Sequence, residues 1–271
     1  MSNQSLWNKD FLLDTGINFV VYLIYYLLMV IIAVVAKDQL HASLGEAGLA
    51  SGIFIVGTLL ARLQFGKAIE LYGRRMSLYG GIIFYFVTTL LYFYIPNLAI
   101  LYVIRFLNGM AYGIVSTATN TIVASCIPPE KRGQGINYYG LSTSLAAAVG
   151  PFLGMLLIVI TNFTFIITLC AVLVGLCMIG CIILHINEIE LTSEQIAKMK
   201  AMTLDNYVEY RVMVISIIGF FMGFAYSSVL TFLAAYAREI NLVEAGTFFF
   251  VVYAVVITLT RPLTGIIFDR K

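Results

Sequence analysis

The sequence predicts an all-α membrane protein, made of a six-helix bundle, a polar linker and the first part of a second bundle. Hydrophobic residues make up 61% of the 271 residues and charged residues only 11%, whereas a soluble domain carries roughly 25% charge. The apolar runs are continuous rather than alternating, which favours spanning helices over strands. A segment of mixed charge separates the sixth apolar run from the seventh.

Eight apolar runs are close to the length of about 20 residues that a spanning helix needs. They divide the chain into an N-terminal bundle over residues 1–186, a linker over 187–210 and a partial second bundle over 211–271. The expected spans are 11–36, 47–65, 76–95, 98–122, 136–160, 163–186, 211–236 and 246–264.

The basic residues predict the orientation of these spans. With the N-terminus in the cytoplasm, the cytoplasmic regions hold eleven Lys and Arg residues, and the opposite loops hold two. This positive-inside bias places both ends of the chain and the linker in the cytoplasm. We therefore expect a multi-pass protein of a cell membrane, and of the cytoplasmic membrane of a bacterium.

An internal repeat links the two predicted bundles. The residues LGEAG at 44–48 reappear as LVEAG at 242–246, 198 residues on. Arg62, Gly66 and Glu70 recur as Arg261, Gly265 and Asp269, 199 residues on. A structural repeat of about six helices is common in transporters, and a complete second copy would bring the protein to about twelve spans. We therefore expect the sequence to be C-terminally truncated.

The loop after the second span combines two glycines, one acid and two basic residues: Gly66, Glu70, Gly73, Arg74 and Arg75. A partial second copy is Gly265, Asp269 and Arg270. This pattern resembles the signature between the second and third helices of the major facilitator superfamily, with Glu70 in place of the usual Asp and Leu71 in place of the usual Arg.

The other two motifs lie in the fourth and fifth spans. Arg105 with Gly109 and Gly113 is similar to the intramembrane motif of the fourth helix of the family. The set Gly150, Pro151 and Gly154 resembles the motif of its antiporter branches. The resemblance implies a drug or metabolite efflux antiporter, monomeric when full length, in which the Gly-Pro motif forms a tight interface between bundles; an ordinary proline kink is the alternative.

Polar residues line one face of two predicted helices, within an arc of roughly 80° at 100° per residue. On the fourth span, Arg105, Asn108, Tyr112 and Ser116 form a stripe that suggests a cavity wall. The alternative is a buried Arg105 that pins two helices together. On the first span the face is Asp14, Asn18, Tyr22 and Tyr25, which suits an amphipathic organic substrate; the alternative is that Asp14 and Asn18 cap the helix.

The signature loop predicts a conformational latch. Gly66 and Gly73 would permit a tight turn and close helix approach. Glu70 would accept hydrogen bonds from a helix N-terminus or pair with a basic residue. Arg74 and Arg75 carry inside-positive charge, and setting the topology is the simpler alternative for those two.

Together these features predict a substrate:proton antiporter that exports a drug-like or small organic solute by alternating access. No acidic residue lies at mid-depth in a predicted span, so protons would use Asp14, Glu70 or further helices. An uptake symporter or facilitator, and a transport-incompetent sensor or assembly paralogue, are the alternatives. No set of catalytic residues, phosphate loop, metal site, cofactor site or basic stripe for nucleic acid is visible in the sequence.

Overall fold

The computed structural model describes residues 6–188, 192, 210–225, 240 and 243–269. In this part of the chain, regular structure is entirely helical, and six helices are long and apolar enough to cross a membrane. This confirms the all-α prediction. The six helices are α1 (Lys9–Leu40), α2 (Leu44–Tyr72), α3 (Arg74–Leu90), α4 (Leu98–Cys126), α5 (Arg132–Ile160) and α6 (Phe163–Ile183).

Each of the first six predicted spans overlaps one of these helices. Short 3-10 turns extend two of them: η1 (Leu91–Phe93) follows α3, and η2 (Pro129–Lys131) precedes α5. The largest difference lies in α2, which continues past residue 65 to Tyr72. The helix therefore carries Gly66 and Glu70 within its last turns.

The later part of the chain is described in pieces. A 3-10 turn, η4 (Tyr210–Val212), precedes an apolar helix over Met213–Ala225, and α9 spans Val243–Asp269. The remainder of the seventh predicted span and nearly all of the predicted linker lie outside the described residues. The chain divides into one compact unit of residues 1–190 with 257–271, and another of residues 191–256.

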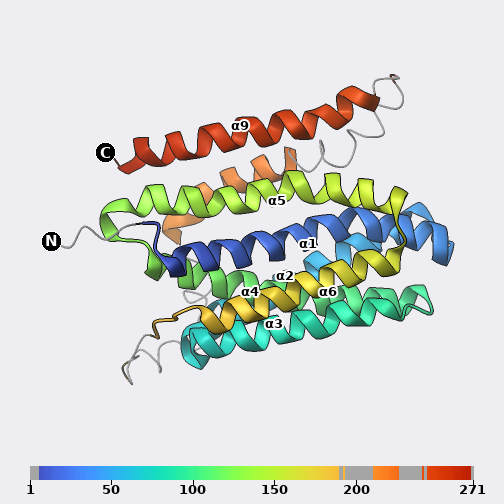
Figure 1. The fold of residues 1–271 in the computed structure, drawn as a ribbon, viewed down its shortest axis with the longest axis horizontal. Helices are drawn as coiled ribbons and strands as arrows, with labels where there is room; N and C mark the ends of the chain where they lie inside the picture. Colours follow the sequence, from blue (N-terminus) through green and yellow to red (C-terminus); the bar gives the residue numbers. More distant parts are fainter. Residues whose placement is uncertain (1–5, 189–191, 193–209, 226–239, 241–242, 270–271) are drawn as a thin grey trace. The chain divides into compact units, whose positions relative to one another are not determined.

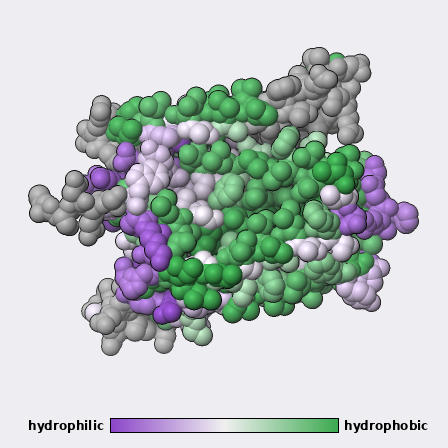
Figure 2. Space-filling view, in the orientation of Figure 1, coloured by the Kyte–Doolittle hydropathy of each residue, from purple (hydrophilic) through white to green (hydrophobic). Residues whose placement is uncertain are grey.

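Within the first unit, α1 to α6 lie side by side (Figure 1). Large apolar side chains such as Val103, Ile179 and Ile182 are exposed on these helices. Figure 2 shows hydrophobic residues over the middle of the visible face and hydrophilic residues gathered toward its two ends. This distribution suits helices that face lipid at mid-length and water at their ends.

Glycine brings α2 and α4 into close contact. A Cβ at Gly57 would meet the backbone oxygen of Phe106, and a Cβ at Gly109 would meet that of Phe54. The hydroxyl of Thr58 donates a hydrogen bond of 3.0 Å to the carbonyl of Gly109. Small residues allow such close packing where the hydrophobic effect does not drive helices together.

The Gly-Pro motif packs α5 against α1. A Cβ at Gly150 would lie 3.1 Å from the carbonyl oxygen of Leu23, and one at Gly154 would lie 3.0 Å from that of Leu27. Pro151 lies inside α5 and is buried. The tight contact seen at this motif is therefore within the first bundle, and an additional contact between bundles stays a prediction.

Candidate functional site

The N-terminus of α1 is capped by a residue that precedes Asp14. The Asn8 side chain accepts a 2.8 Å hydrogen bond from the backbone N–H of Phe11 and donates a 3.0 Å bond to the carbonyl of Cys126. Asp14 lies five residues after Lys9, where α1 begins, which corresponds to about 8 Å along the helix axis. The capping alternative therefore does not account for Asp14.

Asp14 is instead a fully buried carboxyl group, with an exposed fraction of 0%. Neither of its oxygens has a hydrogen-bond partner among the described residues. The hydroxyl oxygens of Thr15 and Tyr139 are also buried without a hydrogen-bond partner by geometry there. An unpartnered buried carboxyl within a span is a strong candidate for a functional role.

Asn18 connects three helices. Its amide nitrogen donates to Ser142 at 2.9 Å and to Thr143 at 3.2 Å, both on α5. Its amide oxygen accepts from Thr119 of α4 at 3.4 Å. Asn18 is 1% exposed, so it lies inside the bundle, one helical turn from Asp14. Sequence reasoning did not assign Ser142 and Thr143, although a polar run over 142–144 interrupts an apolar span.

Aromatic residues of three helices meet beyond Asn18. Tyr25 stacks on Phe54 with ring centroids 5.0 Å apart and lies 5.0 Å from Tyr112. Tyr22 contacts Tyr112 edge-on at 5.3 Å. Phe54 and Tyr112 are buried, whereas the tyrosines of α1 are half-buried. We name this group the aromatic cluster; its members are Tyr22, Tyr25, Tyr26, Phe54 and Tyr112.

A cation that sequence reasoning left out of the pathway lies beside this cluster. Nη2 of Arg62, on α2, donates to Ser116 at 3.2 Å and to the hydroxyl of Tyr22 at 3.5 Å. The Arg62 side chain is exposed, whereas Ser116 is fully buried. The recurrence of Arg62 as Arg261 was the available signal, but it did not indicate which way the side chain points.

Arg105 is fully buried and hydrogen-bonded between helices. Its Nε donates to the carbonyl of Ala50 at 3.0 Å and its Nη2 to that of Ser51 at 3.3 Å. Its guanidinium carbon lies 4.5 Å from the centroid of the Phe54 ring. Its Nη1 donates to the hydroxyl of Tyr92, in η1, at 3.4 Å. The contacts with Ala50, Ser51 and Phe54 fit the role of pinning α4 to α2, which was the alternative to a cavity wall.

Asn108 continues this buried network toward α3. Its amide nitrogen donates to Thr88 at 3.0 Å and to Thr89 at 3.4 Å, and its oxygen accepts from Tyr92 at 3.4 Å. The predicted stripe on α4 therefore divides in two. Arg105 and Asn108 bind neighbouring helices, whereas Tyr112 and Ser116 lie beside the aromatic cluster and Arg62.

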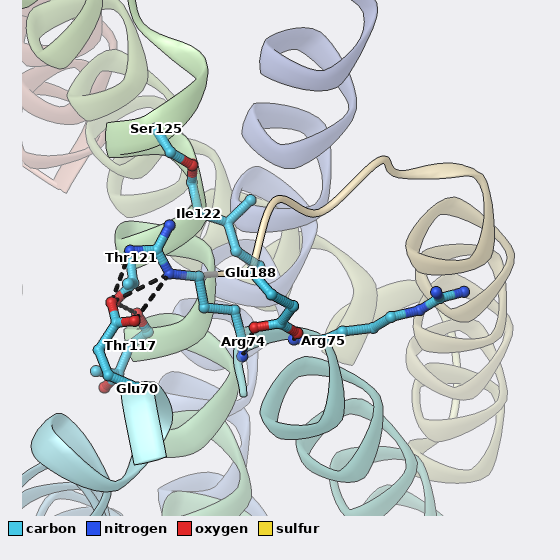
Figure 3. A network of polar contacts seen from close by, with 8 residues as sticks. All are labelled: Glu70, Arg74, Arg75, Thr117, Thr121, Ile122, Ser125 and Glu188. Atoms are coloured by element: carbon cyan, nitrogen blue, oxygen red, sulfur yellow. Dashed lines mark hydrogen bonds and ion pairs between the residues drawn. The ribbon is translucent and has the colours of Figure 1, made fainter. Parts of the chain in front are cut away.

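The signature loop forms an ion pair. Nη2 of Arg74 lies 2.7 Å from Oε1 of Glu70, and the Arg74 side chain is 8% exposed against 22% for Glu70 (Figure 3). Gly73 has a φ of +89° and forms the turn between α2 and α3. Gly66 lies inside α2, and a Cβ there would meet no heavy atom within 4 Å. The predicted tight turn and close approach are thus confined to Gly73.

A residue that follows α6 completes this loop. Glu188 Oε2 accepts a 2.8 Å hydrogen bond from the backbone N–H of Arg74, and Oε1 accepts one of 2.8 Å from that of Arg75 (Figure 3). Glu188, rather than Glu70, therefore meets the N-terminus of α3. In the second copy, Gly265 and Asp269 lie on α9 without described side chains, and Arg270 lies outside the described residues.

Six apolar helices around buried polar side chains define the chain as a multi-pass α-helical membrane protein. The chain belongs to the Major Facilitator Superfamily, whose family model matches residues 15–271. The superfamily consists of transporters, in agreement with the resemblance in the sequence. Among the described residues, no group of three or more His, Cys, Asp or Glu side chains could hold a metal ion.

The curated relatives are transporters of several kinds. The chain is 27% identical over 203 residues to the multi-drug resistance efflux pump PmrA of Streptococcus pneumoniae, covering 73% of this chain and 50% of the pump. It is 24% identical over 152 residues to an uncharacterized MFS-type transporter of Methanocaldococcus jannaschii, covering 56% and 37%. It is 31% identical over 110 residues to a hexose transporter of Saccharomyces cerevisiae, covering 40% and 19%. The matched region spans half or less of each relative.

Proposed function

We propose that this chain carries the substrate and proton path of a proton-coupled exporter of small organic solutes. The observation that carries the proposal is Asp14, a buried carboxyl group whose two oxygens have no partner in the described part of the chain. Burying an ionised carboxylate without a partner costs far more than burying the neutral acid. A group in that setting is suited to take up a proton in one conformation and to release it in another.

The solute would bind a few turns further along α1. Tyr22 lies eight residues after Asp14, which is about 12 Å along the axis. The aromatic cluster offers half-buried rings with hydroxyl groups, which suit a partly apolar organic molecule. The Asn18 network lies between the carboxyl and the cluster, so a proton at Asp14 would influence solute binding through α1, α4 and α5.

Alternating access would use the loop between α2 and α3 as a latch. The pair between Glu70 and Arg74 and the cap from Glu188 would hold the end of the bundle that carries them. From the positive-inside bias we place that end, together with the N-terminus, in the cytoplasm of a bacterial cell. Efflux of drug-like solutes is supported by the match to a multi-drug efflux pump over 73% of the chain.

A solute uptake symporter is the second candidate, because the relatives include a hexose transporter. The direction of proton movement separates the two. Everted membrane vesicles from cells that express the gene would be energised, and the internal pH followed by a fluorescent probe. An exporter predicts that adding its solute makes the vesicle interior less acidic. Proton movement in the opposite direction on solute addition would identify a symporter. Solute flux without proton movement would identify a facilitator, and no flux would favour a sensor or assembly role.

A further inference from the structure

Arg62 is an exposed cation on α2, near the end of the predicted second span at residue 65. It lies ten residues before Tyr72, where α2 ends, which is about 15 Å along the axis. Its neighbours Tyr22 and Ser116 are likewise well inside α1 and α4. A charged side chain within a predicted span is costly unless it faces a water-filled path or a partner.

The partners that Arg62 has are neutral and use one nitrogen. Both of its hydrogen bonds, at 3.2 Å to Ser116 and 3.5 Å to Tyr22, come from Nη2. Arg62 takes part in no ion pair with a described residue, unlike Arg74, which pairs with Glu70. Nη1 and Nε of Arg62 therefore remain available there, and a guanidinium group presents its donors in a fork that matches a carboxylate or phosphate.

Arg105 provides the comparison within the same bundle. It is fully buried, and its guanidinium nitrogens are satisfied by the carbonyls of Ala50 and Ser51 and by the hydroxyl of Tyr92. Arg62 is the exposed arginine and has donors to spare. The two arginines contact different members of the aromatic cluster, since Arg105 lies over Phe54 and Arg62 reaches Tyr22.

We propose that Arg62 and the aromatic cluster form a binding site for an organic anion, in which the guanidinium binds a carboxylate or phosphate and the tyrosine rings pack against an aromatic or apolar body. The rings of Tyr22, Tyr25 and Tyr26 are half-buried and supply the apolar surface next to the cation. A cationic solute is disfavoured here, because Arg62 repels it and the described part of the cluster contains no carboxylate.

This inference rests on the proposed function, because it names the solute class of the same pathway. Binding can nevertheless be measured without transport. Three matched probes differ in one group: 2-naphthoate as the anion, 2-naphthalenemethanol as the neutral form and 2-naphthylmethylammonium as the cation. Equilibrium binding of each radiolabelled probe is measured on the purified protein in lipid nanodiscs.

The wild-type protein is expected to prefer 2-naphthoate, and Arg62→Gln is expected to weaken that binding about ten-fold or more, the scale of a lost charge-assisted hydrogen bond. Arg62→Lys should retain part of the affinity, since it keeps the charge without the fork. The neutral probe should bind Arg62→Gln as it binds the wild type. Arg62 is exposed, so these substitutions should leave the thermal unfolding temperature unchanged, and Arg132→Gln is the matched control for loss of an exposed cation.

Equal binding of the anion to wild type and Arg62→Gln, a preference for the cation, or no binding of 2-naphthoate to the wild type would overturn the inference. The proposed function is tested by a separate measurement, that of proton movement in the wild type and in Asp14→Asn. The wild type and Asp14→Asn could both bind 2-naphthoate, and bind it more weakly when Arg62 is replaced, while neither moves protons when solute is added. In that case the anion site stands and proton-coupled export fails. If proton-coupled export holds and Arg62→Gln transports and binds like wild type, only the anion site fails.

Discussion

Glu188 accepts a 2.8 Å hydrogen bond from the backbone N–H of Arg74, although the two residues are 114 positions apart. The carboxylate also accepts from the next N–H, that of Arg75. Gly73, the N-cap residue of α3, has no side chain that could cap the helix. A residue just beyond α6 thus satisfies the N-terminus of α3 and complements its dipole. The start of the predicted linker is thereby fastened to the signature loop.

Replacing Glu188 tests this cap. Glu188→Ala removes the acceptor of two backbone N–H groups, and the loss of a helix cap costs about 1 kcal/mol. The amides in the first turn of α3 should then exchange with deuterium about five-fold faster, as measured by mass spectrometry on peptides over 74–80. Glu130→Ala removes an exposed carboxylate from η2 and should leave that exchange unchanged. Equal exchange rates in Glu188→Ala and wild type would show that the cap contributes nothing.

Glu70 is predicted to hold the latch through its pair with the nearly buried Arg74. Glu70→Gln keeps the shape and removes the charge, so the latched state should lose about 1–2 kcal/mol relative to the open one. Ser77 is 8% exposed and reports opening: a cysteine placed there should be labelled about five-fold faster or more when Glu70 is neutralised. Glu130→Gln serves as the matched control. If labelling and transport both stay the same, Glu70 is only a surface residue.

Replacing Arg105 is predicted to lower the stability of the bundle more than it lowers the affinity for solute. A lysine keeps the charge but cannot span the carbonyls of Ala50 and Ser51 as the planar fork does. Leaving a buried acceptor unpaired costs about 1–3 kcal/mol, so Arg105→Lys should lower the thermal unfolding temperature, whereas Arg75→Lys should not. Solute affinity per folded molecule should stay near that of wild type. Unchanged stability with lost affinity would instead place Arg105 in the solute pathway.

The close contact of α2 with α4 gives a packing prediction. A Cβ at Gly109 would overlap the backbone oxygen of Phe54, whereas one at Gly175 of α6 would meet no heavy atom within 4 Å. Gly109→Ala should therefore destabilise the bundle by about 1–3 kcal/mol, and Gly175→Ala should be neutral. The measurement is the thermal unfolding temperature of each purified variant. Equal temperatures for the two variants would contradict the packing described for this contact.

The helices could be predicted from the sequence because a spanning segment must satisfy its own backbone in lipid. Helical periodicity also placed Tyr22, Tyr25 and Tyr112 on faces that meet. Contacts between distant segments could not be predicted in this way: Arg62 reaches Ser116 across 54 positions. The position of Asp14 near the end of its span did not indicate that its carboxyl group is buried. The chain before α1 packs on the bundle, through Asn8 and through Trp7 against Tyr138, and it covers the first turns of the helix.

Asp14 is the residue on which the proposed proton path depends most. Asp14→Asn keeps the size of the side chain but cannot exchange a proton. Asp10→Asn, one turn earlier on α1, is the control, because Asp10 accepts a 2.9 Å bond from the backbone N–H of His185 and an amide oxygen can still do so. Both variants, in the intact gene product, would be reconstituted into proteoliposomes with the wild type.

The deciding measurement compares solute movement driven by a pH gradient with solute exchange at equal pH on both sides. Asp14→Asn is expected to lose the gradient-driven movement and to retain exchange, while wild type and Asp10→Asn show both. Gradient-driven movement by Asp14→Asn at the wild-type rate would contradict the claim that Asp14 carries the proton.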